Sequence, residues 1–63
     1  MWVEVTVKVS GKKVLINSEL VQSVYQGDEG VVIDFGGHVE NFFVVKGDYE
    51  EIRSLISYGV WLK

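Results

Sequence analysis

Phe42-Phe43-Val44-Val45 is the stretch that decides the fold, because it is apolar at every consecutive position. A strand that shows one face to water alternates apolar and polar side chains, whereas a strand without this alternation needs cover on both faces. A chain of 63 residues with one predicted helix has little material for two covers. The sequence therefore predicts that a second protein chain covers one side of this strand.

The residues before this stretch read as three further strands and their turns. Valine alternates with polar residues over positions 3–9, which predicts a strand with one buried face. The turn Ser10-Gly11-Lys12-Lys13 and the strand Val14-Leu15-Ile16 complete a hairpin. Asn17-Ser18-Glu19-Leu20 favours a corner, since short polar side chains bond to nearby backbone amides. A third strand and a loop follow: Val21 to Gln26 and Gly27-Asp28-Glu29-Gly30.

Gly36 and Gly37 separate the fourth and fifth predicted strands, and the length of their loop decides which side chains share a face. A two-residue turn would place Ile33 opposite Glu40 and mix charge into an apolar face. A three-residue loop that includes His38 avoids this and predicts these pairs: Phe35 with Val39, Ile33 with Asn41, and Val31 with Phe43. One face then carries Val31, Ile33, Phe35, Val39, Phe43 and Val45. The opposite face carries Val32, Asp34, Glu40, Phe42 and Val44.

Asp48-Tyr49-Glu50-Glu51 has the form of a capping box and predicts a helix from Tyr49 to Tyr58. Apolar residues at spacings of three and four give it one stripe, which needs a sheet face to bury it: Tyr49, Ile52, Leu55 and Ile56. Gly59 is the predicted stop, and the apolar tail Val60-Trp61-Leu62-Lys63 should pack on the sheet or meet a partner. We therefore expect one α+β domain over residues 1–63, an antiparallel β-meander of about five short strands with one C-terminal helix packed on one face.

The charge balance limits the possible partners. A net charge of -3 and a pI of about 4.9 argue against a duplex-binding surface, which relies on Lys and Arg. A local basic patch is still available if four lysines lie together: Lys8, Lys12, Lys13 and Lys46. The chain has no cysteine, no visible secretion signal and no apolar run near the ~20 residues that span a bilayer. We expect a cytoplasmic protein that does not associate with membranes.

Little in the sequence points to catalysis. The single histidine, His38, lies at a predicted loop tip, and the chain lacks a cysteine to pair with it. Asp34, His38 and Glu40 flank this loop as conceivable metal ligands, but Asp34 and Glu40 are more simply the charged side of an amphipathic hairpin. We expect no enzyme, no catalytic residue, no metal site and no cofactor.

The aromatic residues are more informative, because they exceed what one small core needs: Trp2, Tyr25, Phe42, Tyr58 and Trp61. Such residues either pack at core edges or anchor an interface. We predict a non-enzymatic accessory or interaction module, a homo-oligomer with a dimer favoured, or a partner of another protein. Its predicted interface is Trp2, Val32, Phe42, Val44 and Trp61. The alternative is a single-stranded nucleic-acid-binding module that uses the lysine patch and nearby aromatics.

The order of these segments resembles the small flagellar FlbD family of bacteria. The resemblance lies in three places: Ser10-Gly11 followed by Val14 to Val21, Val31 to Gly37, and Val44-Val45 before Glu50-Glu51-Ile52. The chain departs from the family at Gly47-Asp48, where the family tends to have Glu-Ser, and in its tail from Gly59, which is apolar rather than basic. The resemblance implies a small accessory protein with no catalytic residues to transfer.

Overall fold

The computed structural model describes residues 1–37 and 41–57, which form five strands, a short 3-10 helix and one α-helix. Their order along the chain is β1 (Trp2–Thr6), β2 (Lys13–Asn17), η1 (Ser18–Leu20), β3 (Ser23–Gln26), β4 (Val31–Asp34), β5 (Phe42–Val45) and α1 (Tyr49–Ser57). All strand pairings are antiparallel. The predicted α+β class is confirmed, and no helix in the described ranges is long and apolar enough to cross a membrane.

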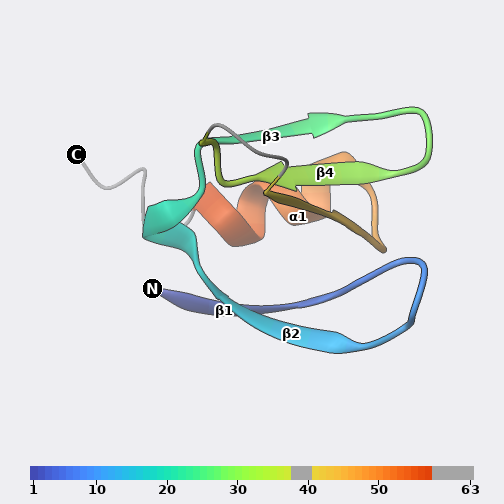
Figure 1. The fold of residues 1–63 in the computed structure, drawn as a ribbon, viewed down its shortest axis with the longest axis horizontal. Coiled ribbons are helices and arrows are strands. Elements are labelled where there is room, and N and C mark those ends of the chain that lie inside the picture. The colour runs from blue at the N-terminus through green and yellow to red at the C-terminus, as the bar shows by residue number, and fades with distance from the viewer. Residues whose placement is uncertain (38–40, 58–63) are drawn as a thin grey trace.

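The strands form two sheets whose backbones are hydrogen-bonded to each other at one place. β1 pairs with β2 in one sheet, and the other has the order β3-β4-β5. An isolated bridge between Val7 and Val45 joins them, flanked by hydrogen bonds from the Lys8 amide to the Val44 carbonyl and from the Lys46 amide to the Thr6 carbonyl, each 2.9 Å. Figure 1 shows the β1–β2 hairpin on one side, the three-stranded sheet on the other and α1 behind that sheet.

The core lies where these three units meet. Its buried residues come from both sheets and from α1: Val3, Val5, Ile16, Val31, Ile33, Val45, Ile52 and Ile56. The predicted helix stripe is wrong at Leu55, whose side chain is 38% exposed. Ile52 and Ile56 are four positions apart and share the face toward the sheets, whereas Leu55 lies to one side, near Met1 and Val3.

The β4–β5 hairpin has the predicted faces but a different register. Ile33 pairs with Phe43 and Val31 with Val45, so the predicted pairs shift by two residues. The Phe35 amide donates to the Asn41 carbonyl at 2.9 Å, which leaves a five-residue loop rather than a three-residue one. This register brings the Phe35 and Phe43 rings edge to face at 6.0 Å. Because side chains alternate with period two, a shift of two residues preserves which face each one occupies.

The first predicted strand also ends earlier than the alternation indicates. Val9 is 91% exposed, although it continues the valine pattern. After Val7 the Lys8 amide bonds to β5, and the Gly11 amide returns to the Val7 carbonyl at 2.8 Å. This tight turn places Val9 outside both sheets.

Two local predictions are confirmed at the level of hydrogen bonds. The Asn17 side chain accepts a bond from the Glu19 amide at 3.1 Å, which starts η1 at the predicted corner. At the start of α1, the Glu51 amide donates to the Asp48 carboxylate at 2.8 Å, and the Asp48 amide donates to the Glu51 carboxylate at 3.2 Å. This reciprocal pair is a capping box.

Candidate interaction surface

The side of the three-stranded sheet that faces away from the core is called the outer face here. Its side chains are Ser23, Tyr25, Val32, Asp34, Phe42 and Val44. One cross-strand row runs from Tyr25 through Val32 to Val44, and the neighbouring row runs from Ser23 through Asp34 to Phe42. Tyr25 and Phe42 are 49% and 45% exposed, so this face shows two aromatic side chains to solvent.

The middle of the outer face is covered by the chain itself. Val32 is only 7% exposed, and its Cγ2 atom lies 3.0 Å from where a Cβ atom on Gly27 would stand. A Cβ atom on Gly30 would likewise lie 3.0 Å from Val44 Cγ1 and 3.3 Å from Lys8 Cδ. The β3–β4 loop and the aliphatic stem of Lys8 therefore supply much of the cover that the sequence led us to expect from a second chain. Val32 has little surface left for a partner.

The other predicted interface residues lie elsewhere. Trp2 is 63% exposed on the β1–β2 hairpin, where it faces the same side as Leu15, which is 61% exposed. Neither is on the outer face. Trp61 lies outside the described residues, as do His38 and Glu40. Leu15 is an exposed residue that sequence reasoning missed, because its short strand gave no alternation to assign its side, and Leu20, 65% exposed, is another.

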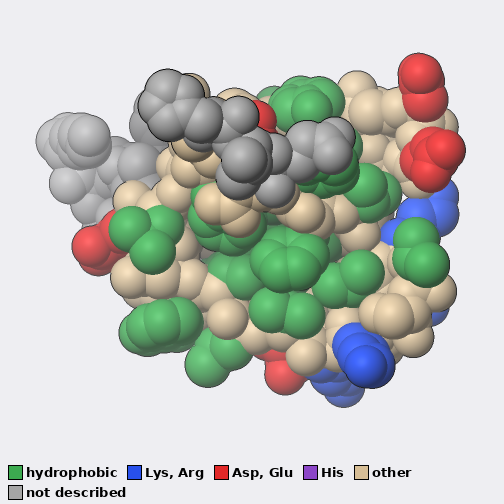
Figure 2. Space-filling view, in the orientation of Figure 1, with side chains coloured by type: hydrophobic (Ala, Val, Ile, Leu, Met, Phe, Trp, Pro, Cys, Tyr) green, Lys and Arg blue, Asp and Glu red, His purple; other side chains and the backbone are tan. Residues whose placement is uncertain are grey.

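Lysines gather at one end of the molecule, where three turns meet. Lys8 and Lys46 flank the bridge between the sheets, Lys12 lies in the β1–β2 turn, and Lys13 is the first residue of β2. Figure 2 shows Lys and Arg side chains along one end of the molecule, with acidic side chains above them. The Lys8 ammonium group donates to the Glu29 carbonyl in the β3–β4 loop. This group of four lysines is called the lysine end below.

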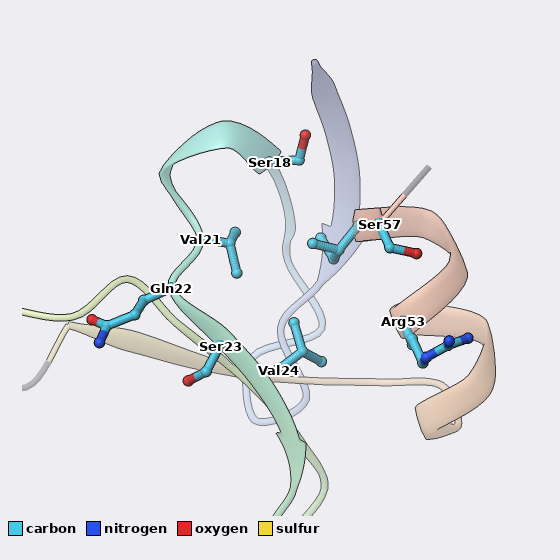
Figure 3. Close-up of a pocket in the computed structure, with 8 residues that line it drawn as sticks. Ser18, Val21, Gln22, Ser23, Val24, Arg53 and Ser57 are labelled. Atoms are coloured by element: carbon cyan, nitrogen blue, oxygen red, sulfur yellow. The ribbon is translucent and has the colours of Figure 1, made fainter. Parts of the chain in front are cut away.

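A hollow of about 310 Å³ lies between η1, β3 and the last turns of α1. In Figure 3, Val21 and Val24 point toward its middle, whereas Gln22, Ser23 and Arg53 point away. Catalysis needs polar groups that converge on one reacting atom. The described side chains of this hollow do not converge, so its geometry offers an apolar depression rather than an active site.

Within residues 1–37 and 41–57, no group of three or more His, Asp or Glu residues is placed to hold a metal ion. The described part of the chain has two exposed ion pairs, between the Met1 amino group and Glu19 at 3.3 Å and between Arg53 and Glu50 at 3.8 Å. Pairs of this kind contribute little to stability. Comparison with known proteins found no matching family model, no matching characterised protein and no matching solved structure.

Proposed function

We propose that this chain is a small non-enzymatic interaction module that self-associates through the outer face. The observation that carries the proposal is the pair of half-exposed aromatics, Tyr25 and Phe42, on a sheet whose other side is buried in the core. A single exposed apolar residue is ordinary on a protein surface. Among the described residues, the two aromatic side chains share this face with Val44 and one carboxylate, Asp34, which is a more unusual surface, and aromatic residues are typical interface anchors.

The proposal includes the cellular compartment and the role that we expect from the sequence. A cytoplasmic accessory role in a bacterium agrees with the absence of cysteine and with the resemblance to the FlbD family. A two-fold dimer is the simplest assembly, because the same patch then contacts itself on both chains. Phe42 is the proposed anchor, and Tyr25 extends the contact toward the sheet edge.

The variant Phe42→Glu tests the contact. It places a carboxylate in a desolvated surface on each copy, and we expect a loss of about 2 kcal/mol or more in association free energy, or roughly 30-fold in Kd. Light scattering across low micromolar concentrations measures the mass of the parent and of the variant. Val9→Glu is the matched control, because Val9 is 91% exposed and lies off the outer face.

Three results are informative. A parent that dimerises, with Val9→Glu like the parent and Phe42→Glu monomeric and folded, supports the proposal. A parent that stays monomeric throughout removes it. A Phe42→Glu variant that loses its far-UV circular dichroism signal shows instead that Phe42 stabilises the fold of the single chain.

The lysine end supports a second candidate function, the binding of single-stranded nucleic acid. Its supporting observation is that the segments carrying Lys8, Lys12, Lys13 and Lys46 meet at one end. Against it, Trp2, the most exposed aromatic residue of the described ranges, stands at the other end of β1 from Lys8, roughly 20 Å away along an extended strand, and cannot stack a base beside these charges. A gel shift with a single-stranded oligonucleotide that weakens steeply with added salt would favour this candidate over self-association.

A further inference from the structure

The strand β3 is an outer strand of its sheet. In the order β3-β4-β5 it has one neighbour, and no other strand of the described residues pairs with it. Figure 1 shows β3 as the upper border of the three-stranded sheet. Its far side therefore presents backbone groups that β4 does not use.

The register identifies those groups. The Gly27 amide donates to the Gly30 carbonyl at 2.8 Å, and this pair continues the alignment of Tyr25 with Val32. Hydrogen-bonded and non-hydrogen-bonded pairs alternate along an antiparallel ladder. Tyr25 is thus bonded to β4, whereas the N–H and C=O groups of Val24 and Gln26 point away from it.

This edge lacks the usual protection against pairing. Edge strands are commonly guarded by charged side chains, prolines or bulges. The β3 sequence Ser-Val-Tyr-Gln has neither charge nor proline, whereas β2, the outer strand of the other sheet, carries Lys13. A bulge is present at the start of β3. The Gln22 amide donates at 2.8 Å to the carbonyl of Asp34, which is also the register partner of Ser23, so two residues of this strand oppose one residue of β4. The segment Val24–Gln26, called the free edge below, has no strand partner on this side among the residues that the structure describes.

We infer that the free edge pairs antiparallel with the free edge of a second copy, with Tyr25 at the two-fold axis. Val24 of each copy then exchanges two backbone hydrogen bonds with Gln26 of the other. Tyr25 meets its counterpart in a non-hydrogen-bonded pair, where Cα atoms are about 4.5 Å apart. The two three-stranded sheets become one six-stranded sheet.

A second copy fits this edge better than an unrelated strand, because the segment is complementary to itself. No charge opposes a like charge, and the two half-exposed tyrosines cover each other on the outer face. The row Tyr25, Val32, Val44 is extended by the same row of the other copy. The inference rests on the proposed self-association but adds a contact separate from the one at Phe42. Because the edge is short, we expect it to be the weaker of the two.

Disulfide trapping with Tyr25→Cys tests the geometry. The chain has no cysteine of its own, so any disulfide must join two introduced residues. A Cα separation near 4.5 Å lies within the range that a disulfide spans. Under a mild thiol oxidant, we expect Tyr25→Cys to give a covalent dimer on a non-reducing gel. Val9→Cys is the control, since Val9 is 91% exposed and lies outside both sheets.

A backbone variant tests the hydrogen bonds. In the Tyr25→Cys background, Gln26→Pro removes an N–H that points away from β4, a change that edge strands tolerate, whereas Gln26→Ala keeps it. We expect the trapping rate to fall roughly tenfold or more with Pro and to stay near its starting value with Ala. Circular dichroism confirms that the Pro variant is folded.

The outcomes separate this inference from the proposed function. If Tyr25→Cys still forms the covalent dimer when Phe42→Glu is also present, the result supports the edge as a contact separate from the one at Phe42. Trapping at Val9 that is as fast as at Tyr25, or trapping at Tyr25 that is indifferent to Gln26→Pro, overturns the edge pairing. A parent that self-associates without trapping at Tyr25 also overturns it and leaves the contact at Phe42 standing, whereas a strictly monomeric parent removes both.

Discussion

The pair Ile56→Ala and Leu55→Ala tests how α1 is seated on the core. The two residues are adjacent, but Ile56 is 5% exposed and Leu55 is 38% exposed. Ile56→Ala removes the Cγ1, Cγ2 and Cδ1 atoms from the buried cluster. At about 0.8 kcal/mol for each methylene-sized group, the lost transfer free energy is about 2.4 kcal/mol. The cavity left behind raises the expected loss to roughly 2–5 kcal/mol.

This loss is large for a small domain. Typical values per residue give a chain of 63 residues a free energy of unfolding of roughly 3–9 kcal/mol. Ile56→Ala should therefore leave the domain marginally folded or unfolded. Leu55→Ala should lose only about 1 kcal/mol, because more than a third of that side chain is already in water.

Urea titration followed by far-UV circular dichroism measures both variants. It is run at one low protein concentration, because self-association would add to the apparent stability. With a slope near 1 kcal/mol per molar urea, we expect the Ile56→Ala midpoint to fall by about 2 M or more and the Leu55→Ala midpoint by about 1 M or less. Equal midpoints, or a larger fall for Leu55→Ala, would refute the placement of the helix face.

Three further variants test local structure. Asp48→Ala removes the cap that accepts the Glu51 amide, and we expect a loss of about 1 kcal/mol in the same urea titration; an unchanged midpoint would show that the capping box is not needed. Gly30→Ala combines a backbone φ of +150° with a Cβ atom 3.0 Å from Val44 Cγ1, whereas Gly11→Ala, at φ +73°, meets nothing within 4 Å. We expect Gly30→Ala to be the more destabilising of the two, and the reverse order would contradict the close approach of the β3–β4 loop to the outer face.

The sequence predicts the local elements of this fold well because their causes are local. The capping box at Asp48, the corner at Asn17 and the alternation of Val3 and Val5 depend on neighbouring residues and are found as expected. Val9 shows the limit of alternation. The chain leaves β2 before Val9, where the Lys8 amide donates to the Val44 carbonyl of β5, a contact that no short window of sequence contains.

The register of β4 and β5 could not be settled in the same way. Shifts of two residues leave every side chain on its predicted face, so the hydrophobic pattern does not distinguish them. The observed register is the one that brings Phe35 and Phe43 into edge-to-face contact. That choice depends on the three-dimensional packing of particular rings rather than on their pattern.

The candidate surface was predicted in part. Phe42 is exposed on the side that the alternation indicates, but Val32 is covered by a loop that approaches through Gly27. Cover from within the chain depends on how a loop folds over a sheet, and the residue pattern of the strand does not contain this information. The role of Phe42 as an interface anchor stays a prediction.

The single bridge between Val7 and Val45 has a consequence for the folding kinetics. Each hairpin of this protein pairs segments that are neighbours in sequence, so each can close early and at small entropic loss. The bridge joins Val7, just after β1, to Val45 in β5, and the β3–β4 and β4–β5 pairings lie between its two ends. Contacts of long sequence separation slow two-state folding. We expect the docking of the β1–β2 hairpin onto β5, rather than the formation of any one hairpin, to limit the rate at which this small domain folds.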